Sequence, residues 1–371
     1  MSEGVAWQIL DLARWAPSGD NSQPWRFEIV SDDHIVVHAF DTRRHCVYDL
    51  DGHASQVSVG ALLETLRIAA TLHGRVAHAV RRPDGSDEHP VIDVRLEAVD
   101  GLAPDPLHAS IQRRSVQRRP LRREPLAAEA RRELEAALAP DHSVLWFEGP
   151  RDLRRFAWLA VRSAKIRLTT PEAYAVHREI IEWGARYSEE RVPDQALGAD
   201  PFSVRSMRFA LASWPRVRMM NRWFGGTLAP RLQLDWMPGV RCAAHFAILA
   251  RNPPAGIDDY LAAGAAMQRF WLTATHCGLQ LQPQYTPLVF ARYVREGRTF
   301  TVVPPAVRRA GVVASMLERL LGPEEARRAV FMGRVGSGPA PVARSLRLPL
   351  ERLRWTARDG EPGSRAPRLY G

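Results

Sequence analysis

The sequence predicts an α+β fold in which a mostly antiparallel sheet is flanked by helices and the whole unit is present twice. Three observations support this prediction: short strand-like runs separated by polar turns, long amphipathic runs ended by glycine, and a pattern that begins again after the first hundred residues. We expect a first half over residues 1–100 and a second half over 101–371, with the connector GLAPD at 101–105. A chain of 371 residues is long enough to bury a core in each half.

The first half begins with a helix and a hairpin. Apolar residues recur at helical spacing between Val5 and Leu12, and the run ends before Pro17. The stretches WRFEIV and HIVVHAF are separated by a polar turn at 31–34 and predict two paired strands. The run VSVGALLETLRIAATLHG predicts a helix that ends at Gly74, and PVIDVRLEAV predicts a further strand.

The second half repeats this order in a longer form. A short helix around LHASIQRR is followed by the helix AEARRELEAALAP, which ends in Ala-Pro, then polar residues, an aromatic pair and Glu, as the first helix does. The run LAAGAAMQRFWLTATHCG predicts another amphipathic helix, which ends at Gly278 and precedes a strand. A helix is also expected from Pro171, with an apolar stripe formed by Val176, Ile180, Trp183 and Tyr187.

Residues 200–240 are rich in aromatic, Arg and Met residues, with helix-like runs broken at Pro215 and at Gly225-Gly226. We weigh two interpretations of this segment. It is either an inserted lid or a helical pair buried against the core. In a lid, aromatic rings would stack on a ligand, and the candidates are Trp214, Trp223 and Phe224.

The composition excludes several classes of function. The net charge is +10, but the cations are scattered and Lys165 is the only lysine, so we expect no nucleic-acid partner and arginine wherever an anion is bound. Neither a basic leader before Val5 nor an apolar run of about 18 residues is present, so we expect a cytoplasmic protein without a membrane partner. The cysteines form no CxxC pair, so neither disulfides nor a metal site is expected; they are Cys46, Cys242 and Cys277.

The stretch APSGDNSQPW follows the first helix and is dense in turn-forming residues. Gly19 lets the backbone approach a partner closely, and Asp20 and Asn21 tolerate left-handed conformations. Pro24 is expected to hold Gln23 extended. The stretch is either a loop that presents backbone and amide groups to a ligand or an ordinary connector from helix to strand.

The stretch RRSVQRRPLRRE places several cations beside a hydroxyl, at Arg113, Arg114 and Ser115. Planar guanidinium groups and a hydroxyl are suited to a phosphate. The alternative is a solvated basic face or a patch for nucleic-acid backbone.

These stretches together resemble the FMN-dependent nitroreductase family. Their order, together with EAYAVHREIIEWGARYSEERVPDQALG, resembles the fused subgroup typified by the Acg-type proteins, and the resemblance covers most of the chain. It implies a three-layer nitroreductase-like fold, arranged as a pseudo-dimer within one chain, and FMN as cofactor. The cofactor-binding positions that it implies are Pro17, Ser18, Gly19, Asn21, Arg113, Arg114, Ser115, Gln117, Pro283, Tyr285, Thr286, Arg344 and Arg347.

The resemblance also implies a role for each group of residues. The turn at 113–115 and the late basic pair at Arg344 and Arg347 match phosphate and ribityl contacts, whereas Gln117 stands where the family commonly has Lys or Arg. The stretch 283–286 matches the backbone beside the flavin N5, with an edge strand containing a proline as the alternative. One loop and one turn are intact, and the second-half loop has decayed to residues 139–142, so we expect one composite flavin site per chain.

The family resemblance implies hydride transfer from NAD(P)H through FMN to a small nitro, quinone or other conjugated acceptor. The flavin performs the chemistry, so no catalytic side chain is assigned. No HExxH, GxSxG or P-loop motif offers another mechanism. The alternatives are a biosynthetic flavin-dependent oxidase or dehydrogenase acting on a tailored metabolite or peptide, and a flavin-binding protein without catalysis. The sequence leaves open whether the pseudo-dimer pairs again into a homodimer.

Overall fold

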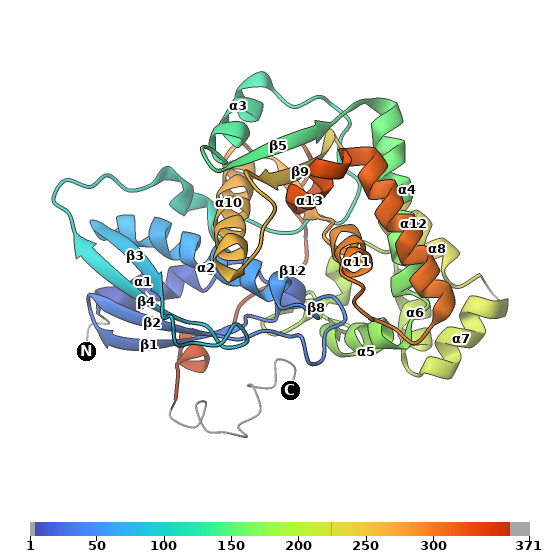
Figure 1. The fold of residues 1–371 in the computed structure, drawn as a ribbon, viewed down its shortest axis with the longest axis horizontal. Helices are drawn as coiled ribbons and strands as arrows, with labels where there is room; N and C mark the ends of the chain where they lie inside the picture. Colours follow the sequence, from blue (N-terminus) through green and yellow to red (C-terminus); the bar gives the residue numbers. More distant parts are fainter. Residues whose placement is uncertain (1–3, 224, 357–371) are drawn as a thin grey trace.

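The computed structural model describes residues 4–223 and 225–356. Two four-stranded sheets lie on opposite sides of a central pair of helices (Figure 1). Every strand pair within these two sheets is antiparallel. The mixed architecture of helices and antiparallel sheet is therefore as predicted.

The first sheet consists of residues from the first hundred only, in the order β1-β2-β4-β3. Its strands are β1 (Trp25–Ser31), β2 (His34–Ala39), β3 (Arg75–Arg81) and β4 (Val91–Ala98). The expected hairpin is present, with Phe27 opposite Val37. Helices α1 (Val5–Ala13) and α2 (His53–Thr71) pack their apolar residues against one face of this sheet.

The second sheet has the order β10-β11-β9-β5 and is covered on both faces. One face packs against α3 (Ala128–Ala136) and α10 (Ile257–His276), and the other packs against α4 (Gly149–Arg167), α11 (Thr286–Arg295) and α12 (Pro304–Leu321). Coverage on both faces explains why β9 is apolar at every position except His245. The strands are β5 (His142–Phe147), β9 (Ala244–Ala250), β10 (Gln280–Pro283) and β11 (Ala329–Gly336).

Helices α2 and α10 form the contact between the two sheets (Figure 1). Their backbones approach so closely that a Cβ atom on Gly60 would lie 2.0 Å from the carbonyl oxygen of Leu261. A Cβ on Gly264 would likewise lie 2.0 Å from the carbonyl oxygen of Val57. Both positions therefore require glycine.

The C-terminal segment returns to the first sheet. Strand β12 (Arg344–Ser345) pairs with β7 (Tyr187–Ser188), and the N–H of Trp355 then donates to the carbonyl oxygen of Phe27 at 2.7 Å. Between these two contacts, the 3-10 turn η5 (Leu350–Leu353) contributes leucines to the core between the first sheet and its helices.

The helix expected from Pro171 is shorter than predicted. Helix α5 (Pro171–Ile180) ends where β6 (Ile181–Glu182) begins, and β6 pairs with β8 (Val192–Pro193). Trp183 and Tyr187 thus lie outside the helix, and the prediction of one stripe is wrong. Gly184, at φ 76°, turns the chain toward the pairing of β7 with β12.

Residues 200–240 form α6 (Pro201–Leu211), α7 (Trp214–Trp223), α8 (Leu228–Pro230), the π-helical turn η4 (Arg231–Trp236) and α9 (Met237–Val240). No residue of α6 and only Val217 of α7 is buried, so the interpretation as a buried helical pair is wrong. Pro215 lies in the first turn of α7 rather than at a break. Phe224 lies outside the described residues.

The remaining elements are short. The expected helix around LHASIQRR is only the 3-10 turn η2 (Pro106–Ser110), and the chain also contains η1 (Gly19–Asn21), η3 (Asp194–Ala196) and α13 (Pro323–Arg328). In the part of the chain that the structure describes, no helix has the length and apolar character that crossing a membrane requires.

A candidate anion and cofactor site

The loop after α1 has a backbone conformation that residues other than glycine seldom adopt. Asp20, Asn21 and Gln23 have φ angles of 51°, 65° and 47°. Asp20 and Asn21 adopt left-handed conformations, which their residue types were expected to tolerate. The expectation that Pro24 keeps Gln23 extended is wrong, because Gln23 is left-handed as well. The N–H of Gln23 instead donates to Ser18 Oγ at 2.9 Å, which closes the loop on itself.

Hydrogen bonds to distant segments hold this loop in place. Gln23 Nε2 donates to the carbonyl oxygen of Glu189 at 2.8 Å, and Gln23 Oε1 accepts from the N–H of Leu348 at 2.9 Å. Asn21 Nδ2 donates to the same Glu189 oxygen at 2.9 Å. The loop, the turn after β7 and the C-terminal segment therefore form one hydrogen-bonded unit.

Two arginines from the C-terminal segment reach the loop and the turn at 113–115. Arg347 donates from Nε to the carbonyl oxygen of Ala16 and from Nη1 to Asn21 Oδ1, both at 2.8 Å. Arg344 Nη2 donates to the carbonyl oxygen of Arg114 at 3.2 Å. The structure thus brings together predicted residues that lie more than 200 positions apart in the chain.

Arg114 completes what we call the arginine cluster: Arg114, Arg344 and Arg347. Arg114 is 3% exposed, and its guanidinium lies 4.4 Å from the ring centroid of Trp271. The guanidinium of Arg344 lies 5.4 Å from the ring of Trp15. The Nε atoms of Arg114 and Arg344 and the indole Nε1 of Trp15 are buried without hydrogen-bond partners among the described residues.

The arginine cluster contains no counterion. No Asp or Glu of the described residues lies among the charges that act on its three members. Burial and the two neighbouring guanidinium groups hold the pKa of Arg114 well below its usual value, and burial together with Arg344 and Arg14 lowers the pKa of Arg347 to about 9. Because arginine stays protonated in proteins, these shifts reflect first the cost of burying charged groups and second their mutual repulsion, and a bound anion would offset both.

The other predicted residues of the loop and turn differ in their surroundings. Pro17 is buried, Ser18 is half-buried, and the space beside the Gly19 Cα is open. Arg113 is exposed, whereas the adjacent Arg114 is buried. The hydroxyl of Ser115 is partly exposed and has no partner among residues 4–223 and 225–356.

Gln117 does not offer its amide to a ligand. Its Nε2 donates to the carbonyl oxygen of Pro339 at 2.7 Å, and its Oε1 accepts from the N–H of Arg119 at 3.0 Å. Gln117 therefore fixes the shape of the turn, and as a direct contact to phosphate it is a weak candidate.

Strand β10 lies beside the turn and leads to the last group of predicted residues. Val116 forms a bridge with Leu281, two positions before Pro283. The strand ends at Pro283, and α11 starts at Thr286. The N–H groups of Tyr285 and Thr286 have no backbone acceptor in the described chain, as is usual at the start of a helix.

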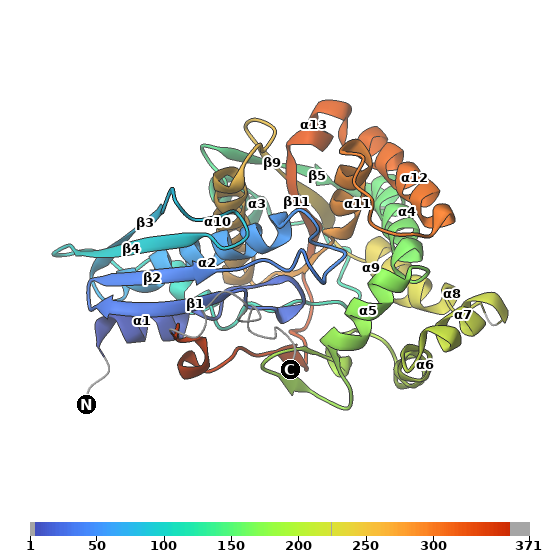
Figure 2. The same ribbon diagram turned by 60° about the horizontal axis from the view of Figure 1, so that its bottom comes forward.

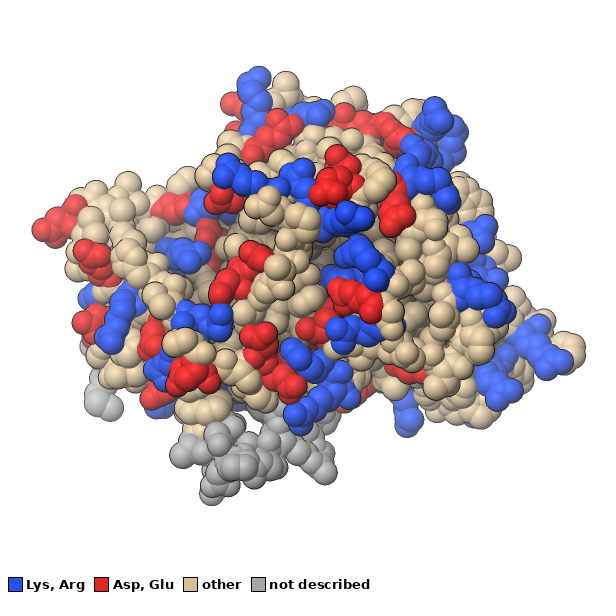
Figure 3. All heavy atoms as spheres, viewed as in Figure 1, with Lys and Arg blue, Asp and Glu red and all other residues tan. Residues whose placement is uncertain are grey.

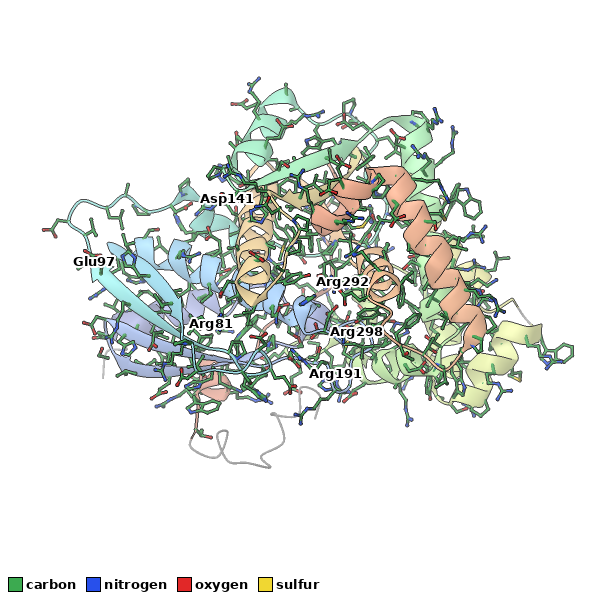
Figure 4. All side chains as sticks on the ribbon, viewed as in Figure 1. Arg81, Glu97, Asp141, Arg191, Arg292 and Arg298 are labelled. Carbon is green, nitrogen blue, oxygen red and sulfur yellow. The ribbon has the colours of Figure 1, made fainter. Side chains whose placement is uncertain are left out.

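The side chain of Tyr285 belongs to a buried polar cluster at the start of α2. Arg292, which Figure 4 labels on α11, donates from Nε to Asp51 Oδ2 at 2.6 Å. The hydroxyl of Tyr285 and Nη2 of Arg292 make no well-formed hydrogen bond within the described residues. The two groups nevertheless act on each other, because burial raises the pKa of Tyr285 and the Arg292 guanidinium opposes that shift.

Sequence reasoning missed two residues that shape the site, Trp15 and Arg334. Arg334 is fully buried on β11 and donates from Nη2 to the carbonyl oxygens of Gln117 and Arg119, at 3.0 and 2.8 Å. A signal was present, because an arginine flanked by Gly333 and Val335 in a buried strand must find polar partners.

The predicted decayed loop, residues 139–142, lines a different cavity. This cavity has a volume of about 470 Å³ and lies between β3, α2 and α10. Its arginines are all paired with carboxylates: Arg81 with Asp258, Arg67 with Glu64, and Arg269 with Glu64 and Asp105. Unlike the arginine cluster, this cavity has no surplus positive charge to attract an anion.

Metal ligands and reactive cysteines are the remaining features on which the sequence led to an expectation. Among residues 4–223 and 225–356, no group of three His, Cys, Asp or Glu side chains is arranged to hold a metal. Burial raises the pKa of Cys242 to about 12 and, with Glu133 beside it, that of Cys277 to about 11. Burial also raises the pKa of Cys46. These thiols therefore have little thiolate character near neutral pH.

Comparisons with known proteins give partial similarities. No protein-family model matches the chain. Two curated relatives from Mycobacterium tuberculosis, Uncharacterized protein Rv3127 and Uncharacterized protein MT3212, are each 37% identical over 92 residues, which is 24% of this chain and 27% of theirs. The match thus spans about a quarter of the length of these relatives.

Two solved structures are similar over about two thirds of the chain. A nitroreductase-like family protein from Bacillus cereus is 15% identical and covers 68% of this chain and 96% of its own, with a TM-score of 0.34. The FMN-dependent nitroreductase NfnB from Mycobacterium smegmatis was solved in complex with NADPH and is 18% identical. The match covers 67% of this chain and 96% of that protein, with a TM-score of 0.33.

Proposed function

We propose that this protein binds FMN at the arginine cluster and acts as a flavin-dependent oxidoreductase on a small conjugated acceptor, with NAD(P)H as the electron donor. The observation that carries the proposal is the cluster itself. It contains two buried arginines, Arg114 and Arg347, and the half-buried Arg344, with no carboxylate beside them, and Nε of both Arg114 and Arg344 is unpartnered among the described residues. A phosphate monoester offers the charge and the acceptor oxygens that such a group lacks.

The surroundings of the cluster support a ligand larger than a phosphate ion. The free hydroxyl of Ser115 and the open space beside Gly19 lie on the two segments that the arginines join. We propose that the arginine cluster would hold the phosphate, and that Ser115 and the loop at 17–21 would bind the polyol chain. The N–H groups of Tyr285 and Thr286 would donate to the ring. When bound, the flavin would supply hydride transfer at its N5.

The structure also supports one site per chain. The loop comes from the first half, and the turn and the late arginines come from the second. The corresponding loop at 139–142 lines a cavity whose arginines are already neutralised. We therefore propose a pseudo-dimer within the chain, with a stoichiometry of one FMN per chain.

The proposal is tested by titrating apoprotein with FMN and, in parallel, with riboflavin, which lacks the phosphate. Replacing Arg114 or Arg344 by Gln should weaken FMN binding by roughly 10- to 100-fold, as expected for loss of a hydrogen bond to a charged group. Riboflavin binding should change little. Arg132→Gln, an exposed position on α3, is the matched control and should bind FMN as the wild type does.

Anaerobic addition of NADPH to the loaded protein tests the reaction. Loss of the oxidised flavin spectrum supports a nicotinamide-driven oxidoreductase. If the flavin binds but stays oxidised, the binding site would be supported, but the assignment of NAD(P)H as electron donor would be overturned. Failure of the wild type to bind FMN, or equal weakening of FMN and riboflavin by Arg344→Gln, would overturn the phosphate site.

A further inference from the structure

Residues 201–234 combine positive charge with a complete absence of acidic side chains. This stretch contains no Asp or Glu, and its six arginines are Arg205, Arg208, Arg216, Arg218, Arg222 and Arg231. We call residues 201–223, which form α6 and α7, the basic tip. In Figures 1 and 2 the basic tip lies at the end of the molecule opposite the first sheet, and Figure 3 shows blue side chains without red neighbours there.

Large apolar side chains are exposed between these arginines. Phe202 is 78% exposed, Trp223 is 72% exposed, and Phe209 is 50% exposed. The guanidinium of Arg216 lies 4.7 Å from the ring centroid of Phe209, and that of Arg222 lies 5.3 Å from the ring of Trp223. The apolar and basic groups therefore form one mixed surface, which continues into the exposed Leu228 and Leu232.

The basic tip is anchored to the body, although it is hardly buried. Asp200 caps α6 by accepting hydrogen bonds from the N–H groups of Phe202 and Ser203, at 2.9 and 3.0 Å. On α7, Asn221 Nδ2 donates to the carbonyl oxygen of Leu168 at 2.7 Å. The exposed aromatic rings are thus presented on fixed helices.

We propose, in place of the sequence-based expectation of no membrane partner, that the basic tip docks on the surface of an anionic phospholipid bilayer without crossing it. Arginine is attracted to the negative headgroups, while Phe and Trp gain by entering the boundary with the acyl chains. The basic tip of a second copy of the chain would fit this surface poorly, because two such tips would place arginines against arginines with no Asp or Glu between them. A nucleic acid would satisfy the arginines but not the exposed aliphatic side chains beyond α7.

The test is co-sedimentation of the full chain with vesicles of about 30% phosphatidylglycerol in phosphatidylcholine, compared with pure phosphatidylcholine. Each arginine near an anionic surface contributes roughly fivefold to the partition coefficient. The triple variant Arg216→Gln, Arg218→Gln, Arg222→Gln should therefore bind about 100-fold more weakly. The apolar variant Phe202→Ser, Trp223→Ser should also lose binding, without a change in net charge.

The matched control replaces three exposed arginines elsewhere: Arg95→Gln, Arg132→Gln and Arg151→Gln. It has the same net charge as the triple variant, and we expect it to bind vesicles within a few-fold of the wild type. Equal binding to the two vesicle types would overturn the proposal, as would equal loss in both triple variants. Binding of the wild type to an acidic polypeptide, without binding to vesicles, would also overturn it in favour of an acidic protein partner. None of these outcomes depends on FMN.

Discussion

Arg347 Nη1 lies 2.8 Å from Asn21 Oδ1, although 326 positions separate the two residues in the chain. This hydrogen bond joins the loop after α1 to the segment that contains Arg344 and Arg347. The same asparagine donates to the carbonyl oxygen of Glu189, so one side chain connects three parts of the sequence. The conformation of the loop therefore depends on tertiary contacts as well as on its own turn residues.

Replacing Asn21 should show how much of the loop's stability comes from the side chain and how much from the backbone. Asn21→Ala loses these hydrogen bonds and places alanine at φ 65°, so we expect a loss of roughly 2–4 kcal/mol of unfolding free energy. Asn21→Gly loses the same bonds without the backbone strain and should be about 1 kcal/mol more stable than Asn21→Ala. Urea unfolding measures both variants, and equal stabilities would contradict the left-handed conformation.

The close contact between α2 and α10 predicts a sharp contrast among glycines. Gly60→Ala or Gly264→Ala places a Cβ against the backbone of the opposite helix, so we expect a loss of at least 1–3 kcal/mol. Gly311→Ala on α12 is the control, because the space beside that glycine is open. It should stabilise the protein by about 0.5–1 kcal/mol through helix propensity. Similar unfolding midpoints for all three would refute the contact.

Two ion pairs of different burial should respond differently to loss of the acid. Asp51 is almost fully buried with Arg292, so Asp51→Asn leaves a buried charge unpaired and should cost about 3–5 kcal/mol. Asp258 pairs with Arg81 at the surface, and Asp258→Asn should cost less than about 1 kcal/mol. Thermal unfolding of the two variants checks which substitution destabilises the protein more. An equal loss of stability would show that Asp51 is accessible to water.

His245 predicts a loss of stability in acid. Its ring nitrogens lie 2.8 Å from Gln284 Oε1 and from the carbonyl oxygen of Gly239, and burial lowers its pKa to about 4 from a usual 6.5. Between these values the unfolded chain binds more protons than the folded one, so stability present at pH 7 falls as the pH drops below 6.5. The loss is at most about 3 kcal/mol.

The measurement is the unfolding free energy of the wild type and of His245→Gln between pH 7 and pH 4. The histidine contribution disappears in the variant, so the gap between the two proteins should narrow as the pH falls. His53 and His177, whose pKa values burial also lowers, are present in both proteins and cancel in the difference. A gap that stays constant with pH would mean that His245 has the same pKa in the folded and the unfolded protein, which would contradict the predicted shift.

The regular elements around the core were predictable because their signals are local. The apolar period of α2 and α10, with Gly74 and Gly278 just beyond their ends, indicates these helices without knowledge of any partner. The hairpin of β1 and β2 was predictable for the same reason. The stripe through Trp183 and Tyr187 has a helical period as well, but pairing with the C-terminal segment overrides it.

The site was predictable only in part. The sequence pointed to Arg113 and Arg114 equally, and only the fold shows that the second is buried beside Trp271 and the first is exposed. The left-handed φ of Gln23 depends on its bonds to Glu189 and Leu348, and no local pattern encodes contacts across so many residues. The resemblance to a flavin-binding family indicated the candidate residues, and the arrangement of their charges comes from the structure.

The route of the C-terminal segment has a consequence for protein synthesis. Arg344, Arg347 and Leu348 complete the unit that contains the first loop, and they are synthesised more than 300 residues after that loop. During translation the first sheet can therefore form long before its loop acquires these partners. A ligand that needs the arginine cluster can be bound only after Arg347 has been synthesised, so a nascent chain that stops before this residue lacks the complete cluster.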